Sequence, residues 1–299
     1  MNILITGGSG FIGRNLVEGL KTKYKIYAPS HKQLDLFDYK KVNTYIKKNK
    51  IKVVIHSAIK GGDMVFENTM RMFMSILYSI DHIDKFIHLG SGAEYAKTRD
   101  LKKVKEIDFG KFIPEDDYGF AKYLCSRIAQ NNKKIITLRL FGIYGKYEDY
   151  RYKFIANSIV KNLLKFPIKI KQSVIFDYLY IDDFVKIVDD FIKKPSKHNF
   201  YNISPTKSIS LIEIVKIINK ISDYKSKIEV INKGLNFQYT ADNKRLLSEI
   251  KGFKFTSYEE GIARLYSYYS NMFEKLDRSA IIRDEYFIKS KIKNANKKT

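Results

Sequence analysis

Short apolar runs alternate with amphipathic segments along the first half of the chain. We interpret five runs as buried strands: Ile3–Ile5, Lys25–Ala28, Ile51–His56, Lys85–Leu89 and Lys134–Phe141. Between these runs, apolar residues recur at helical spacing, which predicts helices at Arg14–Leu20, at Leu34–Ile46, in a segment that ends at Ile80 and at Tyr118–Ala129. Strands and helices that alternate in this way are typical of a doubly wound parallel sheet with helices on both faces.

The second half of the chain continues the alternation with shorter strands. The pattern predicts a helix within Tyr147–Leu164, a strand and a helix start over Val174–Asp183, a strand at Phe200–Ile203, a helix at Ser210–Ser222 capped by Ser208 or Ser210, and a closing helix at Ser257–Phe273. We find no interdomain linker, so we expect a discontinuous arrangement. The expected parts are a first domain of residues 1–150 to which 174–200 return, a smaller α/β lobe of 151–282, and a basic, flexible tail of 283–299.

Composition narrows the class of protein. The 299 residues suffice for one large α/β domain and a smaller lobe. The formal charge of +23 comes mostly from lysines spread along the chain without a nucleic-acid motif, so we expect no nucleic-acid partner. The single cysteine, Cys125, excludes an internal disulfide and a multi-cysteine metal site, and we expect it to be buried packing. No segment approaches the roughly 18 apolar residues of a membrane helix. Because the first strand starts almost at once, we expect no signal peptide and a cytoplasmic location.

A glycine-rich turn follows the first strand. Thr6–Gly13 reads Thr-Gly-Gly-Ser-Gly-Phe-Ile-Gly, and a helical pattern begins directly after it. In this context we expect Gly7 to allow a tight turn, Gly10 to let the backbone approach a pyrophosphate, and Gly13 to let the helix pack on the strand. The helix N-terminus would offer free N–H groups to phosphate. The sequence therefore predicts a Rossmann-type α/β domain that binds a dinucleotide.

The residues after the second strand bear on which dinucleotide is bound. An enzyme strict for NAD usually places an acid there for the ribose 2′-hydroxyl, whereas this chain has Pro29–Lys32 and no acid until Asp35. Because the cation of Lys32 suits a 2′-phosphate, we expect NADP, with NAD as the alternative. Ser57 and Ala58, after the third strand, are small enough to let the chain pass close to the cofactor.

Three polar residues supply candidate chemistry further along the chain. Ser91 follows the fourth strand, and ligands of open α/β sheets bind at the carboxyl ends of strands. Tyr118 and Lys122 are four residues apart on a predicted helix and so share one helical face. A neighbouring ammonium, aided by an oxidised nicotinamide, lowers the pKa of a tyrosine from about 10, which allows proton exchange near neutral pH. We predict that Tyr118 is the general acid/base, that Lys122 lowers its pKa, and that Ser91 holds the substrate oxygen while the cofactor carries the hydride.

These landmarks, in this order, resemble the extended short-chain dehydrogenases/reductases that act on nucleotide sugars. The resemblance covers residues 2 to about 273, and Ser30–Leu36 and Ala58–Gly62 are most similar to the GDP-fucose synthase group of NADP-dependent 4-keto-sugar reductases. It implies that Asp35 and Leu36 flank the adenine and that Lys32 meets the 2′-phosphate. The predicted cofactor site then comprises Thr6, Gly7, Gly10, Phe11, Ile12, Gly13, Lys32, Asp35, Leu36, Ser57, Ala58, Asn68, Tyr118 and Lys122.

The resemblance also implies a nucleotide-diphosphate sugar as substrate, and we expect a homodimer and a role in surface-polysaccharide synthesis. The family often has an arginine, which contacts the substrate diphosphate, where this chain has Phe176. Another cation must then contact the diphosphate in this protein. The predicted substrate site comprises Ser91, Arg151, Lys153, Tyr178 and Arg245.

The residues after Ser91 bear on the reaction. Family dehydratases resemble one another in carrying Asp and Glu there, and GDP-fucose synthase has a cysteine acid/base at the second position, whereas this chain has Gly92 and Ala93. If the segment is extended, Glu94 points to the opposite side from Ala93. We therefore predict simple 4-keto reduction without inversion at C3 or C5. The alternatives are a 4-epimerase with tightly held NAD and a non-catalytic sugar-nucleotide-binding relative.

Overall fold

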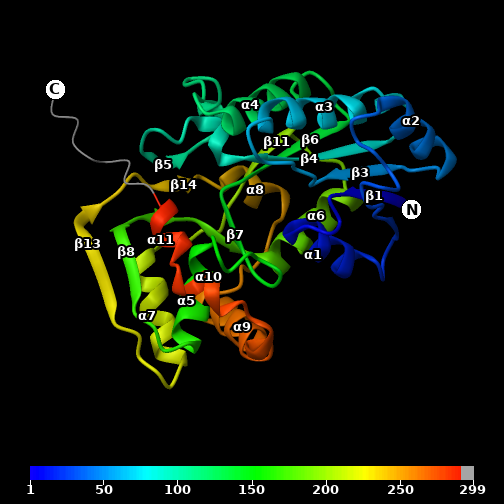
Figure 1. The fold of residues 1–299 in the computed structure, drawn as a ribbon. Coiled ribbons are helices and arrows are strands. Elements are labelled where there is room, and N and C mark those ends of the chain that lie inside the picture. The colour runs from blue at the N-terminus through cyan, green and yellow to red at the C-terminus, as the bar shows by residue number, and fades with distance from the viewer. Residues whose placement is uncertain (291–299) are drawn as a thin grey trace.

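The structure, a computed structural model, describes residues 1–290 and is organised around one parallel sheet (Figure 1). The sheet runs, edge to edge, in the order β11 (Phe200–Ile203), β6 (Ile135–Leu140), β4 (Lys85–Ser91), β3 (Val53–His56), β1 (Asn2–Thr6) and β2 (Lys25–Tyr27). The chain passes from β1 to β2 on one side and then returns to β3 on the other. The strand order therefore reverses at β1, and such a switch point opens a crevice at the carboxyl ends of β1 and β3.

Helices cover both faces of this sheet (Figure 1). One face carries α1 (Phe11–Leu20) and α6 (Ile181–Lys193), and the other carries α2 (Tyr39–Lys48), α3 (Val65–Leu77) and α4 (Asp117–Ala129). Successive strand residues serve opposite faces, since side chains alternate along a strand. Ile3 and Ile5 pack with Leu16 of α1, whereas Leu4 packs with Val42 of α2. Together these layers form the doubly wound α/β domain that the sequence pattern predicts.

The remaining elements form a second, smaller lobe. Its strands make three short sheets: β7 (Gly142–Tyr144) with β10 (Tyr178–Tyr180), β8 (Ile168–Ser173) with β13 (Ile228–Leu235), and the four-stranded order β12 (Ile209–Ser210), β9 (Ile175–Phe176), β14 (Tyr239–Ala241), β5 (Leu101–Val104). Its helices are α5 (Phe154–Leu163), α7 (Leu211–Ile221), α8 (Lys244–Glu249), α9 (Tyr258–Ser270), α10 (Arg278–Ile282) and α11 (Glu285–Lys289). Short 3₁₀ turns lie at η1 (Ile80–His82), η2 (Gly92–Tyr95), η3 (Glu106–Asp108) and η4 (Phe273–Lys275).

The chain crosses between the two parts several times. Helix α6 packs on α1, and β11 then pairs with β6 at the edge of the large sheet. The returning strand thus lies just beyond the expected range of 174–200, while β9 and β10 within that range belong to the small sheets. Strand β5, from the first half of the chain, pairs with β14 of the small four-stranded sheet.

Two expectations about local structure are wrong, and a third, the choice between Ser208 and Ser210 as a cap, is decided. The helix after β2 does not start at Leu34: it starts at Tyr39, because the Asp38 carboxylate accepts hydrogen bonds from the first-turn N–H groups and caps it. The strand expected from Val174 is broken at Asp177, whose carboxylate accepts hydrogen bonds from the Ser208 hydroxyl and the Ala241 N–H. Ser208 is thereby occupied, and Ser210 caps α7.

The expectation of a flexible tail from residue 283 is wrong for residues 283–290. This segment contains α11, where the Tyr286 ring packs 5.6 Å from the Phe154 ring and the Lys171 ammonium donates to the Ile288 and Ser290 carbonyls. Residues 291–299 lie outside the described residues. Across residues 1–290, none of the helices is both long and apolar enough to span a bilayer.

Candidate active site

The three glycines of the first turn each meet a steric requirement at the end of β1. Gly7 has φ +70°, and a Cβ on it would lie 2.7 Å from the Ala58 Cα. A Cβ on Gly13 would lie 2.1 Å from the Gly7 oxygen and 2.8 Å from the Ser57 Oγ. A Cβ on Gly10 would meet only the Gly7 oxygen, at 3.4 Å, so its outer side is open. The turn is therefore compressed on its inner side and accessible where a pyrophosphate would lie.

Hydrogen bonds join the ends of β1 and β3 beneath this turn. The Ser57 hydroxyl donates to the Thr6 oxygen at 2.6 Å, and the Thr6 Oγ1 lies 2.8 Å from the buried His56 Nδ1. Burial lowers the pKa of His56 to about 3, so its ring stays neutral at physiological pH. His56 is thus a structural residue that fixes Thr6.

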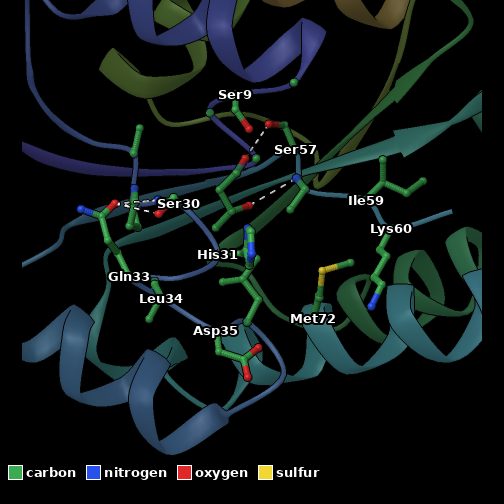
Figure 2. Close-up of a pocket in the computed structure, with 18 of the residues that line it drawn as sticks. Ser9, Ser30, His31, Gln33, Leu34, Asp35, Ser57, Ile59, Lys60 and Met72 are labelled. Carbon is green, nitrogen blue, oxygen red and sulfur yellow. Dashed lines mark hydrogen bonds between the residues drawn. The ribbon is translucent and has the colours of Figure 1, made fainter.

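A cavity of about 970 Å³ opens over these strand ends (Figure 2). Figure 2 shows Ser9 and Ser57 at one end, and His31, Asp35 and Met72 farther along. The cavity is lined by Thr6, Gly7, Gly8, Ser9, Gly10, Val17, Ala28, Pro29, Ser30, His31, Gln33, Leu34, Asp35, Leu36, Phe37, Ser57, Ala58, Ile59, Lys60 and Met72. Its length along three strand ends suits an extended nucleotide.

The dinucleotide that the fold implies fits this cavity. Gly10 is the N-cap of α1 and has no side chain to satisfy the first N–H groups, which leaves them available to phosphate. Phe11 and Ile12, in the first turn of α1, contribute such N–H groups while their side chains pack against the core. The cavity, the open backbone at Gly10 and the uncapped helix together form a cradle for a pyrophosphate and an adenosine.

Several predicted cofactor residues do not line the cavity. The turn at Ser30–Leu34, closed by hydrogen bonds from Gln33 N and Leu34 N to the Ser30 oxygen, places His31 on the cavity wall and leaves Lys32 exposed outside it. Asn68 is half-buried on α3 and is likewise absent from the lining. The cations on the wall are therefore His31, when protonated, and Lys60.

Ser91 ends β4 and is held by a capping box. Its hydroxyl accepts the Ala93 N–H at 3.1 Å, and its N–H donates to the Glu94 Oε1 at 2.8 Å. The segment is therefore not extended: it forms η2, and Glu94 folds back beneath Ser91. There the second Glu94 oxygen accepts from the Arg139 Nε at 2.6 Å, with both side chains fully buried. The sequence contains the signal that we missed, since Ser-x-x-Glu is the capping-box pattern.

Tyr118 and Lys122 lie on one face of α4, beside Ser91. The Asp116 side chain caps this helix by accepting the Gly119 N–H at 3.1 Å. Helix α4 packs against η2, which begins directly after Ser91, and the Tyr118 hydroxyl is close enough to Ser91 for that residue to lower its pKa. The buried Lys122 ammonium donates to the Leu89 carbonyl at 2.7 Å. Side chains from two distant parts of the sequence thus converge at the end of β4.

In the chain alone, the pKa of Tyr118 is set mainly by burial. Burial raises it above its ordinary value of 10, and Ser91 opposes that shift. Burial also lowers the pKa of Lys122. The lowering of the Tyr118 pKa by Lys122 and an oxidised nicotinamide concerns the cofactor-bound enzyme and stays a prediction.

Tyr239 is a site residue that the sequence reasoning missed. It comes from β14 of the smaller lobe, and its hydroxyl oxygen lies 2.6 Å from where a Cβ on Gly92, the residue after Ser91, would stand. Its ring packs 5.0 Å from Phe141 and 5.9 Å from Phe176. With 22 tyrosines in the chain, nothing local distinguishes this one; the available signal was Gly92, whose lack of a side chain leaves room for it.

A second cavity of about 310 Å³ adjoins Tyr239 in the smaller lobe. Its wall is apolar and aromatic, with lysines at Lys97 and Lys171. The Lys97 ammonium also lies 5.6 Å from the centre of the Tyr118 ring and 3.1 Å from the Asp116 Oδ1. The second cavity therefore has two lysines on its wall, one of which, Lys97, also lies beside Tyr118.

The predicted diphosphate cations lie elsewhere. Arg151 makes two hydrogen bonds of 2.8 Å to Asp149. Lys153 precedes α5, where its charge lowers the pKa of the buried Glu148. Arg245 stacks 5.0 Å over Phe200 and donates to that residue's carbonyl.

These cations are engaged in local contacts, and none of the three lines the second cavity. Tyr178 is also absent from that lining; its ring packs 5.0 Å from Phe176. Cys125 is fully buried, and burial raises its thiol pKa to about 12, in keeping with a packing role.

Comparison with known proteins is consistent with this geometry. Residues 3–204 match the model of the NAD dependent epimerase/dehydratase family. The chain is 26% identical to GDP-L-colitose synthase of Yersinia pseudotuberculosis, over 91% of this chain and 98% of that protein. It is also 26% identical to ADP-L-glycero-D-manno-heptose-6-epimerase of Brachyspira hyodysenteriae, over 82% of this chain and 90% of that protein.

A solved structure supports the fold. A GDP-L-fucose synthetase from Naegleria fowleri, bound to NADP, superposes with a TM-score of 0.82 at 16% identity, over 91% of this chain and 94% of that one. The two relatives are named for nucleotide-linked sugars, the matched family is named for its dependence on NAD, and the solved structure holds NADP. The chain therefore belongs to the NAD dependent epimerase/dehydratase family and is a nucleotide-sugar-modifying enzyme that uses NADP or NAD.

Proposed function

We propose that the protein is an NADPH-dependent reductase of a nucleotide-linked 4-keto sugar, in the synthesis of a surface polysaccharide. The observation that carries this proposal is the convergence of Ser91, Tyr118 and Lys122 at the end of β4, where α4 packs against η2 and Lys122 donates to the Leu89 carbonyl. Two hydroxyl groups and an ammonium are what a carbonyl needs when it accepts a hydride and then a proton.

Each residue has a distinct task in this reduction. Ser91 donates a hydrogen bond to the ketone oxygen, which polarises the carbonyl. The bound cofactor supplies the hydride. Tyr118 then donates its proton to the developing alkoxide, and the Lys122 ammonium stabilises the phenolate that remains. Because burial keeps the Tyr118 pKa high in the chain alone, this hydroxyl is protonated before the reaction and is ready to act as the acid.

The neighbouring positions support reduction without inversion at C3 or C5. Gly92 and Ala93 carry no group that transfers a proton, and the Glu94 carboxylate is committed to Arg139 and to the Ser91 N–H. An elimination or an epimerisation at a carbon next to the ketone would need a further acid/base beside the sugar. The relative from Yersinia pseudotuberculosis is named for the synthesis of a GDP-sugar, which favours a nucleotide-diphosphate sugar as substrate.

For the cofactor we favour NADP. Strand β2 is followed by Ala28 to His31 without an acid that would bind a ribose 2′-hydroxyl, and His31 and Lys60 are cations on the cavity wall. We place the 2′-phosphate between these two residues rather than at Lys32, which lies outside the lining.

The experiment is a panel of nucleotide-linked 4-keto sugars incubated with NADPH or NADH in deuterated water. We expect stoichiometric NADPH oxidation, a C4 alcohol, and no enzyme-dependent deuterium at C3 or C5. Deuterium at these carbons would reveal an additional acid/base and contradict simple reduction. The relative from Brachyspira hyodysenteriae is named as a 6-epimerase, which favours an epimerase as the second candidate, and for this chain we keep the 4-epimerase. That alternative predicts tightly bound NAD and isomerisation without net cofactor consumption.

A further inference from the structure

A fully buried ion pair lies beneath Ser91, and the proposed reduction gives it no task. The Glu94 carboxylate accepts the Ser91 N–H at 2.8 Å with one oxygen and the Arg139 Nε–H at 2.6 Å with the other. Both side chains of the pair are fully buried. Because the two bonds use different oxygens of one carboxylate, the position of the Ser91 backbone is tied to the position of Arg139.

Stability alone does not account for this pair. A buried salt bridge is often no better for stability than apolar side chains of the same volume, because each charge loses its hydration. The Arg139 Nη2 also has no hydrogen-bond partner among residues 1–290, which is a further cost. Strand β4 nevertheless makes room for the acid, since a Cβ on Gly90 would collide with the Glu94 Oε1. The fold thus accommodates a pair that lowers its stability, which points to another task.

Arg139 is itself held from several sides. Its guanidinium lies 3.9 Å from the centre of the Phe109 ring, and its Nη1 donates to the Tyr95 hydroxyl at 3.2 Å. That hydroxyl donates to the Asn202 Oδ1 at 2.8 Å, and the Asn202 Nδ2 donates to the Val104 carbonyl at 3.0 Å. Asn202 belongs to β11 of the large sheet and Val104 to β5, which pairs with the smaller lobe. The carboxylate that Arg139 holds is therefore anchored on both parts of the molecule.

We propose that Glu94 is a positioning residue of the active site, whose carboxylate, fixed by Arg139, holds Ser91 where its hydroxyl meets the reacting oxygen. The hydroxyl is held from the same turn, because it accepts the Ala93 N–H at 3.1 Å. This bond uses one lone pair, and the hydroxyl proton stays available for a substrate oxygen. The role in ketone reduction rests on the proposed function, whereas the arrangement of the bonds does not.

The site needs two acceptor oxygens from the side chain of residue 94. Glutamine has nearly the shape of glutamate but offers one oxygen, and its NH₂ group accepts no hydrogen bond. Because the charged guanidinium is the stronger donor, we expect the amide oxygen in Glu94→Gln to bond Arg139 and to release the Ser91 N–H. Ser91 then loses one of its two restraints, and a displacement of about 1 Å can lower a rate by about 10²-fold.

The chain contains a matched control for this substitution. Ser210 and Glu213 form the same capping box at the start of α7, where the Ser210 N–H donates to the Glu213 Oε2 at 2.8 Å. Glu213 is exposed and makes no ion pair with an arginine among residues 1–290. Glu213→Gln therefore makes the same chemical change on a different element.

The first arm of the test needs no turnover. Protein labelled with ¹⁵N-serine gives the Ser91 amide signal, which is assigned by its loss in Ser91→Ala. We expect Glu94→Gln to move the Ser91 amide proton upfield and to speed its exchange with solvent deuterium, and Glu213→Gln to leave both unchanged. An unchanged Ser91 amide in Glu94→Gln would overturn the proposal, even if no 4-keto sugar is reduced.

The kinetic arm uses a double-mutant cycle with Ser91→Ala. We expect Glu94→Gln to lower kcat by about 10- to 100-fold, with the dissociation constant of NADPH unchanged. In the Ser91→Ala background it should have no further effect on kcat, because the hydroxyl that it positions is gone. The melting temperature should fall alike in both backgrounds, because alanine keeps the backbone N–H. A kcat loss that persists with Ser91→Ala, or full activity in Glu94→Gln, would overturn the positioning role.

Arg139→Lys provides a second variant in case Glu94→Gln does not fold. Lysine keeps the buried pair neutral overall, but it lacks the planar guanidinium that bonds the carboxylate and stacks on Phe109, so Glu94 is less firmly held. We expect kcat to fall by about 3- to 10-fold, the loss of one net hydrogen bond, and again only where Ser91 is present. An unchanged kcat would show that Arg139 does not fix the acid and would overturn the proposal.

Discussion

The two ends of the active site are built by different means. At the cofactor end, backbone groups and small residues form the binding surface, and they come from short segments at the ends of three neighbouring strands. At the proposed substrate end, the second cavity, side chains form the surface, and Lys97, Lys171 and Tyr239 reach it from segments far apart in the chain. The first end depends on where the backbone runs. The second depends on which side chains the folded lobes bring together.

This difference has a physical consequence for substitutions. A side chain added to a glycine of the turn cannot be accommodated by movement of its neighbours, because they follow directly on strands of the six-stranded sheet. A side chain at the substrate end can be exchanged at the cost of its own contacts. The same fold can therefore keep its cofactor while its substrate changes, and the following predictions test that contrast.

The largest expected effect lies where the two ends meet. Tyr118→Phe should fold normally and lose activity by about 10²- to 10⁴-fold, the usual contribution of a general acid/base. The matched control is Tyr123→Phe on the same helix. The centre of the Tyr123 ring lies 4.9 Å from the centre of the Phe109 ring. Steady-state kcat measures the effect. Near-full activity in Tyr118→Phe would remove the hydroxyl from the mechanism.

The next largest effect is expected in the cradle. Gly13→Ala places a Cβ 2.1 Å from the Gly7 oxygen, which cannot move without moving the turn. Strain at the upper end of overpacking, about 3 kcal/mol, would weaken NADPH binding by roughly 100-fold if it is relieved by displacing the turn. The control is Gly61→Ala, where a Cβ meets no atom within 4 Å. Cofactor fluorescence titration measures both, and equal affinities would mean that the turn is more adaptable than its geometry indicates.

The buried carboxyl of Glu148 should make the stability of the protein depend on pH. Burial raises the pKa of Glu148 to about 8, although Lys153 opposes the shift and Asp149 adds to it, and its Oε2 has no hydrogen-bond partner within residues 1–290. The folded chain then binds more protons than the unfolded chain between the ordinary carboxyl pKa and pH 8. Stability therefore falls as pH rises through this window, by about 2 kcal/mol between pH 6 and pH 8.

Glu148→Gln, which cannot ionise, isolates this contribution. The unfolding free energies of the two proteins should diverge as the pH rises from 6 to 8, with the Glu148 protein losing stability relative to the variant. Denaturant titrations at several pH values measure the difference. Parallel curves would mean that Glu148 is ionised and paired in the folded protein.

The smallest effect is expected for Arg151, which the sequence suggests as a substrate ligand only because of its charge. Arg151 is half-exposed and bound to Asp149, and surface ion pairs of this kind contribute about 0–1 kcal/mol. Arg151→Ala should change the KM of the sugar nucleotide less than twofold, while Lys97→Ala, on the wall of the second cavity, should raise it more. A larger rise in KM for Arg151→Ala than for Lys97→Ala would instead indicate that the substrate diphosphate binds at Arg151, as the sequence analysis predicts.

The sequence was sufficient to predict features that depend on residues close together in the chain. The glycine turn, the i, i+4 spacing of Tyr118 and Lys122, and the place of Ser91 at a strand end depend on residues within one or two elements, and the structure has all of them at these places. The alternation of strands and helices likewise predicted the doubly wound sheet, because the central runs are buried on both faces.

The failures concern partners that lie far along the chain. Arg245 looks like any free cation in the sequence, but it packs on Phe200 in the fold. The sequence pattern assigns Leu34 to the start of a helix, because an apolar residue there fits helical spacing. In the structure Leu34 is instead buried on the wall of the first cavity. Tyr239 has no local mark, and its role depends on the space above Gly92. Charge and hydrophobicity identify what a residue can do, but tertiary neighbours decide which of these it does.

The position of β11 has a consequence for how the protein is made. This strand completes the edge of the large sheet, yet it is synthesised only after α5, β8, β9, β10 and α6. During synthesis, the cofactor-binding sheet must therefore wait with the β6 edge unpaired until residue 203 has emerged, and an unpaired edge invites aggregation. A fragment that ends at residue 150 would lack both β11 and α6, so we expect it to be insoluble. The two lobes are consequently not exchangeable modules, and a new substrate lobe has to evolve within the existing chain.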